Sequence, residues 1–429
     1  MDRRVVVTGM GVISPVGNTA EEFFSNLVRG KNGIAHVTKF DATDFKSALA
    51  GEVKDFDPTA YMEKSEARRL DLYSQYALAA AEQAVSESNI AGNIEPERLG
   101  VYFGSGIGGF DTIVSEHTNL MEKGPKRVSP MFIPKMISNI AAGNIAIKYG
   151  AKGPCLSIVT ACATGSNCVG EAYRAIKGGF ADAIIAGGAE ASINPLGFAG
   201  FINCMALSES TDPDRASIPF DRERSGFIMG EGAGALILEE YSHAAARGAK
   251  IYAEVTGYGN TCDAYHVTAP DPEGTGGANA IKGALSTSGE FDPEKVYFNA
   301  HGTSTPLNDK TETLAVKKAF GDGAYKVHIS STKSMTGHML GAAGAVNIIH
   351  RKDLQKAKDN GKDVEALRAK YIADYERTTV NANLSLEMGE IDAMIDPEQT
   401  RETIIESLRL LASKKRVRRT SKHHGNQPL

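Results

Sequence analysis

Short apolar runs alternate with glycine turns and helical stretches through the first half of the chain. Stretches with a strand-like run are at 5–7, 99–104 and 181–188, and helical stretches are at about 19–29 and 65–87. The segment 30–60 shows neither period and is expected to be irregular loop. Strands that alternate with helices in this way are typical of an α/β fold.

The stretch 154–170, PCLSIVTACATGSNCVG, is the one around which the other features are arranged. Its apolar run 156–160 predicts a short buried strand, and a helical pattern follows the small residues 161–166. Cys162 lies at this strand-to-helix turn, where free N–H groups and the helix dipole lower a thiol pKa. A small buried hydrophobe is the alternative interpretation of this cysteine.

The opening of the chain recurs in its second half. Val255-Thr256-Gly257-Tyr258-Gly259 repeats Val7-Thr8-Gly9-Met10-Gly11, 248 positions later and again directly after a strand. The economical interpretation is two α/β halves built on one plan, the second of which begins near residue 251.

Two histidines follow predicted strands of the second half. The strand 296–300 ends at His301, and the strand 327–331 leads into the segment that holds His338. Each histidine alone is more often structural than catalytic. Ligand sites of open α/β sheets gather at the carboxyl ends of strands, so we expect both to meet Cys162 at one such edge.

Composition describes an ordinary water-soluble protein. The chain has 429 residues, 42% hydrophobic and 23% charged, and its net charge of −5 gives no reason to expect nucleic-acid binding. Five cysteines show neither metal spacing nor an even count for disulfides. No signal peptide or membrane span is evident, so we expect a cytoplasmic protein with no membrane association.

Five motifs carry a resemblance to a known family: VTGMGVISPVGN, VTACATG, PFDRERSGFIMGEGAG, NAHGTSTPLND and STKSMTGHMLGAAGAV. Over about residues 3–346 the chain resembles the β-ketoacyl-acyl-carrier-protein synthases, of the elongating Cys-His-His type. The resemblance implies the thiolase fold, with duplicated α/β halves in a layered αβαβα arrangement, normally as a homodimer. It implies no cofactor, because the phosphopantetheine arrives on the partner, the acyl carrier protein.

The resemblance also implies roles for the site residues. Cys162 would accept the acyl chain, and His301 and His338 would bind the malonyl thioester oxygen during decarboxylation. The acyl chain would then be elongated by two carbons. Lys333 and Glu312 match a charged pair near the histidines, for which a surface salt bridge is the alternative interpretation.

Further residues match the family's binding positions. By this resemblance, Thr303 and Thr305 would bind the pantetheine arm, and Ile107 and Phe201 would line the acyl tunnel. The patch that docks the carrier protein would consist of Arg68, Arg69, Lys126 and Arg127. An ordinary apolar core explains the tunnel pair equally simply, and a solvated basic face is nearly as good an interpretation of the four cations.

After Val346 the synthase pattern stops. The family's Asn-Ser-Phe-Gly-Phe-Gly-Gly loop, which supplies an oxyanion donor, does not occur in the sequence. Residues 347–429, where helices are expected over 352–375 and 397–413, resemble instead the C-terminal end of a biotin-dependent acyl-CoA carboxyltransferase β subunit. The run GAAGAV at 341–346 fits both families, so we interpret the chain as an apparent chimera joined there.

The sequence thus predicts three parts. Residues 1–250 are a thiolase-like half with the nucleophile, 251–346 a partial second half with both histidines, and 347–429 a foreign helical tail. The absence of two central strands would cost more than the usual stability of about 5–15 kcal/mol, so impaired folding or turnover is expected. A carboxyltransferase fragment and a non-catalytic partner resembling a chain-length factor are the alternative functions.

Overall fold

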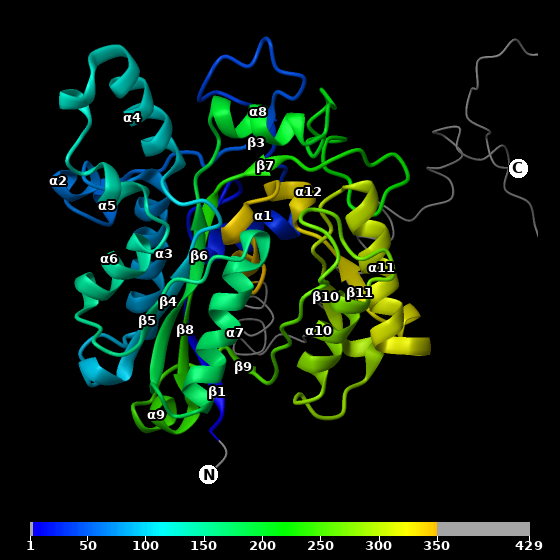
Figure 1. Ribbon diagram of the computed structural model, residues 1–429. Coiled ribbons are helices and arrows are strands. Elements are labelled where there is room, and N and C mark those ends of the chain that lie inside the picture. The colour runs from blue at the N-terminus through cyan, green and yellow to red at the C-terminus, as the bar shows by residue number, and fades with distance from the viewer. Residues whose placement is uncertain (1–2, 350–429) are drawn as a thin grey trace, which may run out of the picture. The chain divides into compact units, whose positions relative to one another are not determined.

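A six-stranded sheet organises residues 3–349, the part of the chain that the computed structural model describes (Figure 1). Its strand order is β5-β4-β6-β8-β1-β9. The strands are β1 (Val5–Ile13), β4 (Leu99–Gly104), β5 (Cys155–Leu156), β6 (Ala183–Glu190), β8 (Gly232–Glu240) and β9 (Ala253–Val255). β4 runs parallel to β5 and β6, whereas β8 is antiparallel to both β6 and β1.

Helices cover both faces of this sheet. The helices of the described chain are α1 (Ala20–Val28), α2 (Lys64–Ala67), α3 (Leu72–Ser88), α4 (Phe110–Lys123), α5 (Phe132–Met136), α6 (Ile140–Tyr149), α7 (Thr164–Lys177), α8 (Pro195–Asn203), α9 (Tyr241–Ala246), α10 (Thr275–Leu285), α11 (Pro306–Phe320), α12 (Lys333–Thr336) and α13 (Ala343–Val346). α3 and α6 pack on one face, and α7 and α13 pack on the other.

Alternation along the strands divides the core between these two faces. In β4, Val101 and Phe103 belong to the apolar cluster beside α3, whereas Tyr102 belongs to the cluster beside α7. Successive side chains of a strand point to opposite faces, so one strand contributes to both clusters. All six residues of β4 are buried, as expected for a strand covered by helices on both sides.

Two smaller sheets complete the described chain. One has the order β2-β3-β7, with β2 (Ala35–His36), β3 (Leu49–Gly51) and β7 (Met229–Gly230). The other pairs β10 (Tyr297–Asn299) in parallel with β11 (His328–Ser330). In Figure 1 this pair lies beside α10 and α11, on the other side of α7 from α3 and α6.

The glycines of the repeated motif explain why it recurs. A Cβ placed on Gly9 or Gly11 would lie 2.2 or 2.0 Å from a backbone oxygen of α3. A Cβ on Gly257 or Gly259 would lie 2.0 or 1.9 Å from a backbone oxygen of α10. Each half therefore needs glycine where a helix crosses the segment of its first strand, and the predicted duplication is confirmed.

The second half is incomplete within the described residues. In the first half, β6 and β8 lie between β4 and β1. The corresponding strands of the second half are β10 and β9, and between residues 3 and 349 no strand joins them. A cavity of about 1050 Å³ lies beside β9, lined by residues such as Val255 of β9, Val169 of α7 and Ala280 of α10.

Three local predictions are corrected. The expected buried strand 156–160 is only Cys155–Leu156, and Leu156 is 51% exposed, because β5 is an edge strand. The expected helix 65–87 is interrupted, because the Asp71 side chain accepts the N–H of Tyr73 and begins a new helix, α3. The expected loop 30–60 contains β2 and β3.

The helices expected at 352–375 and 397–413 lie outside the described residues. The domain boundaries at 250 and 346 stay predictions. In the described part of the chain, no helix combines the length and apolar character that a membrane crossing requires.

Candidate active site

Cys162 lies in a tight turn between β5 and α7. The turn Ala161–Ala163 is a single 3-10 turn that leads directly into the first residue of α7. Ala161 adopts φ of +50°, a left-handed conformation that a residue with a Cβ rarely takes. The predicted strand-to-helix turn is therefore present, and its strained backbone presents a half-buried thiol.

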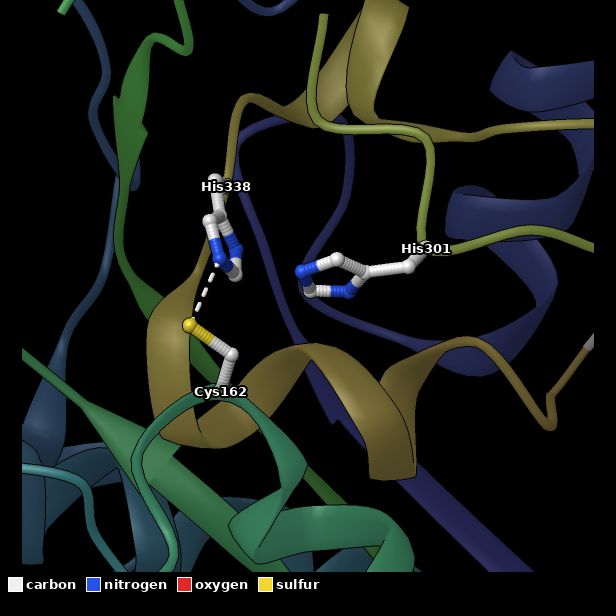
Figure 2. Close-up of side chains that lie close together, drawn as sticks. All are labelled: Cys162, His301 and His338. Atoms are coloured by element: carbon white, nitrogen blue, oxygen red, sulfur yellow. Dashed lines mark hydrogen bonds between the residues drawn. The ribbon is translucent and has the colours of Figure 1, made fainter. Parts of the chain in front are cut away.

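His338 contacts this thiol directly. Its Nε2 lies 3.0 Å from Sγ of Cys162, as the dashed line in Figure 2 shows. The backbone N–H of Leu340 donates to Nδ1 of His338 at 3.2 Å. Since Nδ1 accepts, the neutral ring carries its proton on Nε2 and directs that N–H toward the sulfur.

His301 completes the cluster from the loop after β10. Its ring centroid lies 5.2 Å from that of His338, with the two ring planes at 86° (Figure 2). Sγ of Cys162 and one ring nitrogen of each histidine all lie within 4.8 Å of one another. The three chemically distinctive residues that the sequence indicated are thus brought together.

The cluster forms between two sheets instead of along one edge. Cys162 follows β5 of the six-stranded sheet, whereas His301 follows β10 of the two-stranded sheet. His338 follows α12 and forms a bridge with Met229 of β7. The expectation of one shared sheet edge is therefore corrected: the site lies where the halves of the fold face each other.

Glu312 and Lys333 hold the backbone of His301. The Glu312 carboxylate accepts the N–H groups of His301 at 2.6 Å and Gly302 at 2.7 Å. Nζ of Lys333 donates to the carbonyl oxygen of His301 at 2.5 Å. Lys333 is only 2% exposed, which excludes the alternative of a surface salt bridge. A supporting role in catalysis stays a prediction.

Burial keeps both imidazoles neutral. It lowers the pKa of His301 to about 3, with a smaller contribution from the Lys333 charge. Burial, followed by the charges of Lys333 and His301, also lowers the pKa of His338 well below its usual value. Both rings are therefore hydrogen-bond donors at neutral pH without being cations, which suits binding of a developing oxyanion.

The thiol itself differs from the sequence expectation. Burial raises the pKa of Cys162 above its ordinary value, and the nearby Lys333 charge opposes that rise. Desolvation of the thiolate is thus the largest influence on the pKa of this thiol. Burial also lowers the pKa of Lys333 to about 8, although Glu312 opposes that shift.

The other predicted binding residues surround the cluster. Ile107 and Phe201 pack with Cys162 against an apolar cluster that includes Phe198 and Leu340. Both predicted tunnel residues thus border the same apolar cluster as the nucleophile. On another side, a cavity of about 830 Å³ reaches Cys162, and its lining includes His301, Asn308 and Lys333.

The remaining predicted residues lie in two further places. The hydroxyls of Thr303 and Thr305 are 2.9 Å apart, immediately before α11. The four proposed docking cations are exposed and away from the cluster: Arg68 and Arg69 after α2, and Lys126 and Arg127 between α4 and α5. Exposure suits docking, but the roles of all four stay predictions.

Two buried carboxylates close to the predicted site residues were not singled out by the sequence. Asp309 is 1% exposed and accepts the N–H of Phe220 at 2.8 Å, next to the threonine pair. Glu190 is fully buried at the end of β6 and binds both the loop that holds Ile107 and the turn after His338. The only feature of the sequence that could have indicated Glu190 is its position as the acidic last residue of an otherwise apolar strand.

Comparison with known families agrees with this geometry. Residues 2–244 match the N-terminal domain of β-ketoacyl synthase, and residues 252–351 match its C-terminal domain. The chain belongs to the β-ketoacyl synthase family. The family needs no cofactor of its own, and the Cys-His-His cluster that its chemistry uses is present here.

Curated β-ketoacyl synthases resemble the chain closely. It is 51% identical to 3-oxoacyl-[acyl-carrier-protein] synthase 2 of Synechocystis sp. and 52% identical to that of Vibrio harveyi. Each comparison spans 350 residues, which are 81% of this chain and 84% of the relative.

Solved ketosynthase structures confirm the thiolase fold. The ishigamide ketosynthase/chain length factor matches with a TM-score of 0.75 at 36% identity, over 81% of this chain and 85% of its own. A ketosynthase bound to a hexaketide, in complex with its type II polyketide acyl-carrier protein, matches with a TM-score of 0.73 at 36% identity and the same coverage.

A second family matches the C-terminal part of this β-ketoacyl synthase. The carboxyl transferase domain matches residues 321–427. That match overlaps the synthase C-terminal domain over residues 321–351, which include the run GAAGAV at 341–346. The predicted combination of two families, joined across a segment that fits both, is confirmed.

Proposed function

We propose that this chain condenses a malonyl unit on acyl carrier protein with an acyl group held by Cys162, and so lengthens the acyl chain by two carbons. The observation that carries the proposal is the convergence of Sγ and two histidine nitrogens within 4.8 Å. The rings are neutral and one of them donates toward the sulfur, so the site combines a nucleophile with two oxyanion donors.

Acyl transfer is the first step. The Cys162 thiolate attacks the carbonyl carbon of the acyl-carrier thioester, a new C–S bond forms, and the C–S bond to the carrier breaks. The carrier thiol leaves with the proton that Cys162 lost. Lys333 supports this step, since its charge opposes the rise in the pKa of Cys162 that burial causes.

Decarboxylation and condensation follow. The C–C bond to the malonyl carboxylate breaks, CO₂ leaves, and the electron pair moves toward the thioester oxygen, where N–H groups of His301 and His338 bind the enolate. The enolate carbon attacks the acyl-Cys162 carbonyl, and the C–S bond of that thioester breaks. The thiolate takes a proton, and a 3-oxoacyl group remains on the carrier. Neutral imidazoles suit this step, because each can donate its N–H to the enolate oxygen without a prior change of protonation state.

The carrier protein is the proposed partner. A structural neighbour is a ketosynthase in complex with its acyl-carrier protein, and the four exposed cations beyond α2 and α4 offer positive charge for an acidic carrier. A cytoplasmic location belongs to the same proposal, because the reaction depends on meeting this carrier.

A homodimer is also proposed. The edge strand β5 leaves Leu156 51% exposed, and Val159 just beyond it is 50% exposed. An apolar edge strand that lies open to water invites pairing with another chain. A second copy that covers β5 would bury these side chains. Sedimentation of the full chain should then show a dimer, and a monomer at micromolar concentration would contradict this part of the proposal.

Turnover is expected to be lower than that of an intact relative. The family loop that supplies an oxyanion donor is absent from the sequence, and no strand joins β9 to β10 within residues 3–349. The Vibrio harveyi synthase is the matched comparison under identical substrates. Equal turnover and an equally sharp thermal transition would contradict the expected impairment.

Acyl transfer to the enzyme tests the proposal directly. The full chain is incubated with acyl carrier protein that bears an acyl group. It is then digested, and its peptides are mapped by mass. The acyl group should be found on Cys162, whereas Cys155, Cys204 and Cys262, which are exposed, should remain unmodified. Acylation of those exposed cysteines alone, or of none, would argue against a synthase and favour the carboxyltransferase alternative.

A further inference from the structure

Glu190 is a buried carboxylate that receives an unusual number of hydrogen bonds. It ends β6, and its side chain is completely buried. One carboxylate oxygen accepts from Gly106 N–H at 2.8 Å and Gly341 N–H at 3.0 Å. The other accepts from the Ser105 hydroxyl at 2.9 Å and Ile107 N–H at 3.3 Å. Burial raises the pKa of Glu190, and these hydrogen bonds oppose that rise.

These donors belong to two segments on either side of the site. Residues 105–107 form the loop after β4, and Ile107 of this loop packs against the same apolar cluster as Cys162. Gly341 lies in the turn that follows His338. A Cβ on Gly341 would lie 2.5 Å from the N atom of Gly106, so the two segments are in close contact where the carboxylate joins them.

The turn at Leu340 needs such support. Leu340 has φ of +43°, which is costly for a residue with a branched side chain. Its N–H is the donor that fixes Nδ1 of His338 as an acceptor. If the peptide after Leu340 were released, the left-handed conformation could relax, and this donor would leave the ring. The proton of His338 would then be free to occupy either nitrogen.

We propose that Glu190 is a positioning residue of the condensing site: by binding Gly341 N–H it holds Leu340 in its strained turn, and so keeps the proton of His338 on Nε2. The same carboxylate ties this turn to the loop of Ile107. This inference rests on the condensing function for its effect on rate, but its effect on the His338 ring can be measured without any turnover.

The test uses Glu190→Gln in the full chain. The variant keeps the shape but removes the charge, so the hydrogen bond from Gly341 N–H is weakened where the amide oxygen accepts it and lost where the NH₂ group faces it. The His338 ring is followed by ¹⁵N NMR after labelling of histidine, with the signal assigned by its loss in His338→Gln. We expect the single Nε2–H tautomer of the wild type to become a mixture of two.

The kinetic expectation is separate. Condensation should slow by about 10–100-fold in kcat with little change in KM for malonyl carrier protein, because misplacement of a donor by about 1 Å affects the transition state. The matched control is Ser192→Ala. Ser192 also donates to Glu190, at 3.3 Å, but belongs to neither segment, so its removal should leave tautomer and kcat within about twofold of wild type.

Rescue distinguishes positioning from simple loss of stability. Glycine adopts positive φ without strain, so adding Leu340→Gly to Glu190→Gln should restore the Nε2–H tautomer. A lower melting temperature with an unchanged tautomer would overturn the proposal and leave Glu190 a structural residue. If the wild type itself shows no condensation, the proposed function fails, while the tautomer still decides the role of Glu190. If Glu190→Gln does not fold, Glu190→Asp, whose shorter side chain withdraws the carboxylate from Gly341 N–H, should give a weaker mixture, and an unchanged tautomer there would equally overturn the proposal.

Discussion

Substitution of the repeated glycines tests whether the second half is packed as firmly as the first. The change is Gly259→Ala, with Gly11→Ala as its counterpart in the first half. The new Cβ would lie 1.9 Å from a backbone oxygen of α10 in the first case and 2.0 Å from one of α3 in the second. Real contacts of this kind exceed 3 Å, so the helix must move away from the strand.

The expected cost follows from what is displaced. Backbone in the middle of a helix cannot turn aside as a side chain can, so each substitution should cost about 3 kcal/mol or more, the upper range for overpacking. With an unfolding entropy of about 2.1 cal/mol/K per residue, a fold of about 350 residues shifts by about 1.4 °C per kcal/mol, so the melting temperature should fall by about 4 °C or more. Differential scanning fluorimetry of the full chain measures the shift.

The control is a glycine with free space around it. A Cβ on Gly143, inside α6, would come no closer than 3.9 Å to the nearest atom, a side-chain carbon of Ile140. Gly143→Ala should therefore raise stability by about 0.5–1 kcal/mol, because alanine favours helix. If Gly259→Ala resembled this control while Gly11→Ala was costly, the second half would not keep the strand-on-helix packing described above.

Three further predictions concern the site. Cys162→Ala should remove the acyl-enzyme and lower condensation by about 10⁴-fold or more, as measured by product formation. Lys333→Met should raise the pH at which iodoacetamide alkylates Cys162, because it removes the charge that favours the thiolate; an unchanged profile would refute that influence. Malonyl decarboxylation should stay nearly constant as pH falls from about 8 to about 5, because burial lowers the pKa of His301 to about 3 and the pKa of His338 well below its usual value, so both rings stay neutral over this range. A midpoint near 6.5 in CO₂ release would instead show unshifted histidines.

The elements with a strict steric or chemical requirement could be predicted from the sequence. The echo of Gly9 and Gly11 at Gly257 and Gly259 arises because no side chain fits where strand and helix cross, so the motif survives in both halves. Cys162 stood out because small residues break its strand into a helix. For these features, local sequence carries the physical constraint that produces the structure.

Features that depend on distant partners could not be predicted. The run 156–160 has the composition of a buried strand, yet β5 is exposed because it pairs on one side only. The sequence likewise suggested a lowered pKa for Cys162, since the turn is visible in it and the desolvating surroundings are not. Glu190 binds N–H groups 84 and 151 residues away, and nothing local indicates them.

The fate of the acyl group on Cys162 tests the central claim most directly. The full chain is first acylated with acyl carrier protein that bears an acyl group. Malonyl-loaded carrier protein is then added while the intact mass of the enzyme is recorded. The account predicts that the acyl mass on the enzyme disappears as a 3-oxoacyl carrier two carbons longer accumulates together with CO₂, at a lower rate than in the Vibrio harveyi synthase. An acyl mass that remains on Cys162 while no 3-oxoacyl product forms would contradict the claim that this Cys-His-His cluster is a condensing site.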